Sequence, residues 1–136
     1  MRLWLVGMYG IVATTASVGA MAIKKGITDS TGLVSELPVF QDLKRWADLE
    51  FEFGGHEIRA LDKNLYEATL EHWEINRHFR FELLDAVKDT LKNYRAKKGT
   101  AINCGSGIKE LGDTSALEDN GHTLREITDK LIADLK

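Results

Sequence analysis

The sequence predicts an α/β protein with a mainly parallel sheet. Short apolar runs typical of strands alternate with longer stretches in which apolar residues recur at helical spacing. Glycines join the first run directly to the first helical stretch. A length of 136 residues with 43% hydrophobic residues fits one globular domain. The net charge of −3 gives no reason to expect a nucleic-acid partner.

The first element is a buried strand at Leu3–Val6 that ends at a tight turn. Gly7 suits a turn in which a Cβ has no room, and a helix begins near Ile11. Gly10 would let the backbone approach a pyrophosphate, and the helix would direct its unpaired N–H groups and positive dipole end at it. Ala13 would allow the helix and strand to pack closely.

Two alternatives exist for the uncharged span Leu3–Ile23, a secretory signal and a membrane helix. Arg2 supplies a basic flank, Ala20–Ala22 imitates a cleavage site, and the span is long enough to cross a bilayer. Glycines interrupt the span, however, whereas a signal core is usually a continuous apolar block. The single cysteine, Cys104, excludes an internal disulfide. These features favour a soluble, cytoplasmic protein with no membrane partner.

The glycine spacing favours a nucleotide-binding, Rossmann-like fold. The pattern Gly-x-x-Gly-x-x-Ala departs from the usual Gly-x-Gly-x-x-Gly, and Tyr9 stands where a second glycine is common. An ordinary strand-turn-helix without a nucleotide remains an alternative. In such folds an acidic residue about 20 residues beyond the glycines binds the ribose hydroxyls. Spacing alone selects Glu36, for which an exposed loop carboxylate is the competing interpretation.

Further strands and helices are predicted along the rest of the chain. The predicted strands are Gly32–Ser35, Phe51–Phe53 and Thr100–Asn103. The predicted helices begin after Asp62 or Asn64, run from Phe81 to Tyr94, and begin at a capping box in Thr123–Glu126. Gly54 and Gly55 are expected to end the second of these strands in a turn. The basic residues Lys92, Arg95, Lys97 and Lys98 are interpreted as the solvated end of a helix before Gly99.

No metal site and no catalytic residue is predicted. His56-Glu57 is not part of a zinc-binding His-Glu-x-x-His motif, and Cys104 has no evident neighbour that would stabilise a thiolate. The turn Cys104–Gly107 is a candidate for phosphate or ribose contact, although it lacks the lysine of a P-loop. The final helix carries an apolar stripe and stops at Lys136 without a following strand. We therefore expect the front part of a larger fold, with an exposed stripe that favours association.

Five segments, in order over nearly the whole chain, resemble the archaeal and bacterial branch of myo-inositol-1-phosphate synthase. They are LVGMYGIVATT at residues 5–15, LVSELP at 33–38, FGGHEIR at 53–59, EHWEINRHF at 71–79 and KGTAINCGSGIKELGD at 98–113. The resemblance implies an NAD-dependent isomerase that converts glucose 6-phosphate into an inositol monophosphate, for inositol and phospholipid biosynthesis. NAD oxidises the sugar, the ring closes by aldol addition, and NADH returns the hydride. A homo-oligomer is also implied for the full-length enzyme.

The resemblance also implies roles for individual residues. The pyrophosphate loop of the family falls on Gly7, Met8, Tyr9, Gly10, Ile11, Val12 and Ala13. A Gly-Trp-Asp-Ile segment of the eukaryotic branch matches Gly55–Ile58, so Glu57 replaces Glu36 as the expected partner of the adenosine ribose. Ser106, in the turn from Asn103, is a further expected cofactor contact.

The family's catalytic lysines have no counterparts in this sequence, and Lys98 and Lys109 are not candidates for that role. Residues 1–136 would then be the N-terminal part of a Rossmann NAD-binding domain, without the catalytic and tetramerisation domain. We expect no synthase activity from this polypeptide alone. A non-catalytic module that binds a nucleotide or a partner remains an alternative, and a small exported or membrane-anchored protein is another.

Overall fold

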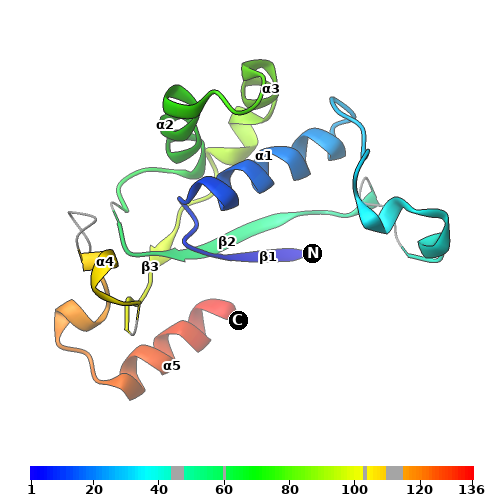
Figure 1. Cartoon of the computed structure of the whole chain (residues 1–136). Coiled ribbons are helices and arrows are strands. Elements are labelled where there is room, and N and C mark those ends of the chain that lie inside the picture. The colour runs from blue at the N-terminus through cyan, green and yellow to red at the C-terminus, as the bar shows by residue number, and fades with distance from the viewer. Residues whose placement is uncertain (44–47, 60, 103, 110–114) are drawn as a thin grey trace.

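The computed structural model describes residues 1–43, 48–59, 61–102, 104–109 and 115–136. The elements are β1 (Arg2–Val6), α1 (Ile11–Lys24), β2 (Glu52–Glu57), α2 (Leu65–Asn76), α3 (Phe81–Leu91), β3 (Lys97–Lys98), α4 (Ser106–Lys109) and α5 (Leu124–Leu135). Short 3₁₀ helices lie at Val34–Glu36, Pro38–Phe40 and Glu118–Asn120. The strands form a parallel sheet in the order β1-β2-β3 (Figure 1). The predicted fold class is therefore confirmed.

The register of the sheet brings the carboxyl ends of all three strands to one edge. Leu3 lies opposite Phe53, and Val6 lies opposite His56 in the β1–β2 ladder. Strand β3 pairs only with the end of β2, where Glu57 lies opposite Lys98. Loops that follow parallel strands meet at such an edge, which is where ligands of open α/β sheets bind.

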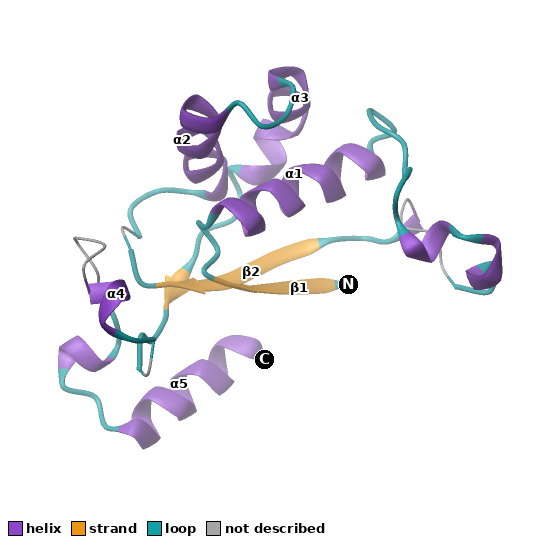
Figure 2. Ribbon diagram, in the orientation of Figure 1, coloured by secondary structure: helices purple, strands orange, loops and turns teal. Residues whose placement is uncertain are grey.

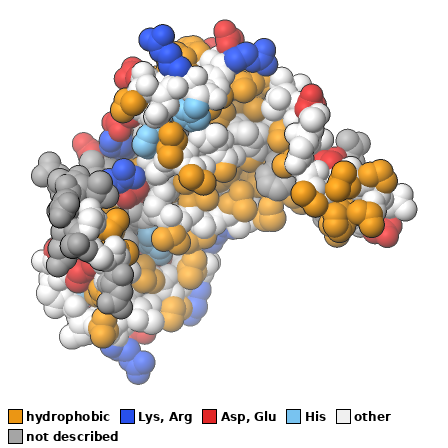
Figure 3. Space-filling model, viewed as in Figure 1, with side chains coloured by type: hydrophobic (Ala, Val, Ile, Leu, Met, Phe, Trp, Pro, Cys, Tyr) orange, Lys and Arg blue, Asp and Glu red, His pale blue; other side chains and the backbone are white. Residues whose placement is uncertain are grey.

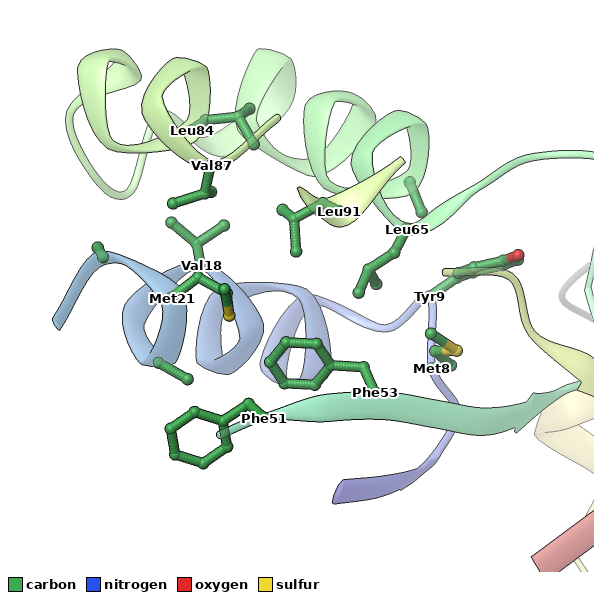
Figure 4. Close-up of a cluster of buried hydrophobic side chains, with 13 residues drawn as sticks. Met8, Tyr9, Val18, Met21, Phe51, Phe53, Leu65, Leu84, Val87 and Leu91 are labelled. Carbon is green, nitrogen blue, oxygen red and sulfur yellow. The ribbon is translucent and has the colours of Figure 1, made fainter. Parts of the chain in front are cut away.

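Helices cover both faces of the sheet. Helices α1, α2 and α3 lie on one face and α5 lies on the other (Figure 2). Figure 4 shows the core between α1, α3 and β2, to which α3 contributes Leu84, Val87 and Leu91 at the expected helical spacing. Each of these side chains is fully buried, which contributes about 1.5–3 kcal/mol apiece relative to exposure.

Two helices begin at capping boxes: the sequence predicts the one at Thr123, and of the two candidate caps Asp62 and Asn64 the structure uses Asn64. The Asn64 side chain accepts the Glu67 N–H at 3.0 Å, and the Glu67 carboxylate accepts the Asn64 N–H at 2.7 Å. Thr123 and Glu126 make the same reciprocal pair at the start of α5. These caps satisfy backbone donors that have no partner within the helix.

The glycine pair Gly54-Gly55 lies inside β2, so the predicted turn at this position is wrong. A Cβ on Gly55 would lie 2.3 Å from the Leu5 carbonyl oxygen and 2.9 Å from the Met8 Cβ. A Cβ on Gly54 would lie 2.6 Å from the Trp4 ring. The glycines thus make room for neighbouring side chains and backbone while the strand continues to Glu57.

The predicted strand at Gly32–Ser35 is also wrong. Gly32 adopts φ +91°, the Leu33 N–H donates back to the Ser30 carbonyl at 3.0 Å, and a 3₁₀ helix begins at Val34. Pro38, which has no N–H to donate, begins the next 3₁₀ helix. Local turns therefore prevail over the strand propensity of Leu and Val, and residues Glu52–Glu57 take the position beside β1.

The third strand lies earlier than predicted. The Thr100 hydroxyl and the Ala101 N–H both donate to the Glu118 carboxylate rather than to a neighbouring strand, and Asn103 lies outside the described residues. Of the basic run only Lys92, the C-cap of α3, lies at a helix end, because α3 stops at Leu91 and Lys97–Lys98 form β3. No helix in the described part of the chain is long and apolar enough to cross a membrane.

Candidate functional site

A glycine turn connects β1 to α1, as the sequence predicts. Gly7 adopts φ +76°, in the left-handed region that favours glycine. The N–H groups of Gly7 and Met8 donate to the His56 carbonyl at 2.9 and 3.1 Å, and the Gly10 N–H donates to the Gly7 carbonyl at 2.9 Å. The turn is therefore held against the carboxyl end of β2.

Helix α1 begins at this turn without a side-chain cap. Its N-cap residue is Gly10, which has no side chain to accept the first N–H groups of the helix. The side chains of Ile11 and Val12 are 39% and 80% exposed, so this end of the helix faces outward. A 14-residue helix adds a positive dipole end to these N–H groups. The combination suits a bound phosphate.

The side chains of Met8 and Tyr9 lie in the core and not beside the outward face of the turn. Met8 is fully buried and Tyr9 is buried (Figure 4). The Tyr9 hydroxyl donates to the Lys63 carbonyl and accepts the Ala96 N–H at 2.9 Å. Burial raises the pKa of the Tyr9 hydroxyl. The side chains of Met8 and Tyr9 are therefore not directed at a ligand on the turn, and their N–H groups donate to His56 and Glu57.

Glu57 ends β2 with its carboxylate directed at the same turn. The side chain is buried, and its Oε2 accepts the Tyr9 N–H at 3.0 Å. Its Oε1 accepts the N–H groups of Ile58 and Arg59 at 2.9 and 3.2 Å. One carboxylate thus joins the turn after β1 to the loop after β2.

The guanidinium of Arg59 completes the surroundings of Glu57. Its Nε lies 3.3 Å from Oε1 and its Nη2 lies 3.2 Å from Oε2. Burial alone would raise the pKa of the Glu57 carboxyl, but hydrogen bonds from Arg59, Ile58 and Tyr9 outweigh it and lower the pKa. Glu57 is therefore ionised at neutral pH.

A pocket of about 460 Å³ opens at this edge of the sheet. Gly7, Glu57 and Gly99, each at or just past the carboxyl end of a strand, line it together with the apolar residues Ile108 of α4 and Leu131 of α5. The volume falls in the usual range of small-molecule pockets. Cys104, Arg59 and Ile58 also line it.

The other candidate residues from the sequence lie in elements outside the glycine turn. Glu36 belongs to the 3₁₀ helices at the opposite end of the sheet (Figure 1), so the structure does not bring it to the turn. Ser106 and Lys109 are the first and last residues of α4. Sequence reasoning did not assign Arg59 a role. Its position two residues beyond the acidic residue, with the opposite charge, is the signal that could have identified it.

The strand order β3-β2-β1, the glycine turn and the acidic strand end define a partial Rossmann-like nucleotide-binding domain. An NAD-binding family model described as myo-inositol-1-phosphate synthase matches residues 1–136. The chain belongs to this family, which confirms the resemblance seen in the sequence. No curated protein matches the chain.

Proposed function

We propose that this chain binds NAD at the carboxyl edge of its sheet, as the nucleotide-binding part of an inositol phosphate synthase. The observation that carries the proposal is the contact between Glu57 and the Tyr9 N–H. It joins the two elements that a Rossmann fold uses for a dinucleotide, a pyrophosphate turn and a ribose-binding carboxylate. The family match independently favours NAD.

The residues at the turn fit a pyrophosphate. Gly7 and Gly10 form the turn, and the N–H groups of Ile11, Val12 and Ala13 belong to the uncapped first turn of α1. A Cβ on Gly10 would lie 3.1 Å from the Gly7 carbonyl oxygen, so a side chain would crowd this tight turn. Glycine at this position also leaves no side chain between the turn and a ligand. Met8 and Tyr9 contribute backbone to the same loop.

The residues around the pocket fit an adenosine. Glu57 provides the carboxylate for the ribose hydroxyls, and the apolar side chains of Ile58, Ile108 and Leu131 suit the faces of an adenine. Ser106 lies at the start of α4, close in sequence to the pocket residue Cys104, and we assign it a backbone contact with the cofactor.

The reaction proposed for the whole enzyme is the isomerisation of glucose 6-phosphate to an inositol phosphate. NAD supplies reversible hydride acceptance in that reaction. This chain would hold the dinucleotide, while the catalytic lysines come from a domain outside residues 1–136. Lys98 is engaged otherwise, because its Nζ donates to the Ser115 hydroxyl at 2.7 Å. The cytoplasmic location and the homo-oligomer belong to the same proposal.

The second half of the Rossmann sheet would add to the free edge of β1. Within the described residues β1 pairs only with β2. Hydrophobic side chains gather on the face of the molecule where β1 and the start of α1 lie (Figure 3). Val6 at the end of β1 and Val12 in the first turn of α1 are 88% and 80% exposed. A dinucleotide-binding fold continues its sheet from this strand.

Calorimetric titration with NAD tests the proposed function. We expect saturable binding to the wild-type chain. Glu57→Gln should weaken it roughly tenfold, because a hydrogen bond to a charged group contributes about 1.5–3 kcal/mol. The matched control is Glu52→Gln, an exposed glutamate on the same strand that pairs with Arg2. The absence of saturable binding, or equal weakening by both substitutions, would contradict the proposal.

A further inference from the structure

The Glu57 carboxylate has more donors than it can serve with a ligand present. Five N–H groups lie within 3.3 Å of its oxygens, three from the backbone and two from the guanidinium of Arg59. A carboxylate offers about four lone-pair positions. The Glu57 side chain is also only 2% exposed. A ribose diol, which brings two hydroxyl donors, can therefore reach Glu57 only if two of the present donors leave.

Two of the three backbone donors are held by contacts with other elements, and the third, the Arg59 N–H, belongs to the residue that follows Ile58. Tyr9 is held at its carbonyl by His72 Nε2 at 2.8 Å, in addition to its N–H contact with Glu57. The Ile58 carbonyl accepts the Ser115 N–H at 2.6 Å, which ties the loop after β2 to the chain before α5. Moving either backbone group would break contacts between separate elements.

The guanidinium of Arg59 is free to leave by rotation of its side chain. Its two contacts, at 3.3 and 3.2 Å, are longer than the 2.7–2.9 Å usual for charged N–H···O pairs. The Arg59 side chain is 39% exposed and also lines the pocket, so water already reaches it. When the guanidinium leaves, the three backbone N–H groups of Tyr9, Ile58 and Arg59 still pair with the buried carboxylate.

We propose that Arg59 occupies the ribose position of the nucleotide site and is displaced when a ribonucleotide binds. The inference rests on the proposed function. The guanidinium directs one N–H at each Glu57 oxygen, and a vicinal diol can direct one hydroxyl at each oxygen in the same way. The diol therefore replaces both contacts at once, and no buried acceptor is left without a donor.

Removal of Arg59 should change the affinity for NAD in the direction opposite to that expected from charge alone. Loss of a cation beside a dianionic pyrophosphate should weaken binding. If Arg59 competes with the ribose, however, its loss should tighten binding. We expect Arg59→Leu to lower the dissociation constant for NAD about twofold to fivefold in calorimetric titration. Arg125→Leu, at an exposed arginine of α5 outside the pocket, should leave the constant unchanged. Equal or weaker binding by Arg59→Leu would overturn the inference.

A measurement on the wild-type chain avoids any effect of the substitution on folding. The Nε–H of Arg59 is a hydrogen-bond donor that NMR can follow during titration with NAD. We expect its exchange with water to accelerate at saturation, in step with shifts at Gly7 and Gly10. Shifts at the glycines with an unchanged Arg59 Nε–H would overturn the displacement while leaving the proposed function intact. No saturable shift anywhere would overturn both.

Discussion

The buried Glu57 carboxylate accepts the Tyr9 N–H at 3.0 Å, so the end of β2 holds the turn that follows β1. The contact spans two neighbouring strands and directs a negative charge toward the glycine turn. It gives Glu57 a structural role in addition to the one proposed for nucleotide binding. Stability and binding should therefore both respond when this side chain changes.

Glu57→Gln should destabilise the chain at neutral pH by about 1–3 kcal/mol, because an amide cannot accept all the N–H groups that face the carboxylate. Hydrogen bonds lower the Glu57 pKa below its ordinary value of 4.5 in the folded state. Its stabilising contribution is therefore complete above that ordinary value and is lost as the pH falls through the lowered pKa.

Urea unfolding at pH 7 and pH 3 measures this effect. The difference in unfolding free energy between wild type and Glu57→Gln should be large at pH 7 and smaller at pH 3. Glu52→Gln, at an exposed ion pair with Arg2, should change stability much less at either pH. A difference that grows on acidification would contradict the assigned direction of the pKa shift.

Two glycine substitutions should have opposite effects on stability. Gly7 adopts φ +76°, so Gly7→Ala should destabilise by about 1–2 kcal/mol. Gly19 lies within α1, and no atom of a neighbouring element comes within 4 Å of the position that a Cβ would take. Gly19→Ala should therefore stabilise the chain by about 0.5–1 kcal/mol. Thermal unfolding of both variants is the check. Loss of stability in both, or in neither, would contradict these expectations.

On the face of the sheet that α5 covers, a series of hydrogen bonds connects α5 to the strands. Trp4 Nε1–H donates to His56 Nδ1 at 3.0 Å, which leaves His56 Nε2 to donate to Asp134 at 3.1 Å. Lys97 Nζ donates to the other Asp134 oxygen at 2.8 Å. Burial alone would raise the pKa of Asp134, but the contacts with Lys97 and His56 lower it.

Asp134→Asn should therefore cost about 1–3 kcal/mol at pH 7, since an amide keeps only one acceptor oxygen for the two donors and loses the negative charge. Asp129→Asn, at an exposed position of the same helix, should stay within about 0.5 kcal/mol of wild type. Chemical denaturation of both variants measures the difference. Equal effects would mean that α5 does not depend on Asp134 for its attachment to the sheet.

The sequence predicts features that depend on nearby residues. The turn at Gly7, a cap at Asp62 or Asn64, the capping box at Thr123 and the apolar spacing of α3 all follow from residues a few positions apart, and the structure uses Asn64 of the two candidate caps. Helical periodicity, helix caps and the preference of glycine for positive φ depend only on residues close together in the sequence. The structure confirms these predictions.

The sequence does not predict features that depend on distant contacts. Gly54 and Gly55 lie within β2, where they pair with Trp4 and Leu5 of β1 and leave no room for a Cβ. No local sequence pattern reveals these contacts. Glu57 could be found only through the family resemblance, because spacing from the glycines selects Glu36. The spacing of Glu57 and Arg59 hints at a pair, but the contact itself depends on the bend after β2, which no local pattern predicts.

The central claim is that NAD binds where the glycine turn meets the end of β2. Mapping backbone amide shifts of the full chain during titration with NAD tests it most directly. We expect saturable shifts concentrated at Gly7, at Gly10–Ala13 and at Glu57, with little change in the 3₁₀ helices at Val34–Phe40. Saturable shifts centred on those 3₁₀ helices, or no saturable shift at the turn, would contradict the claim.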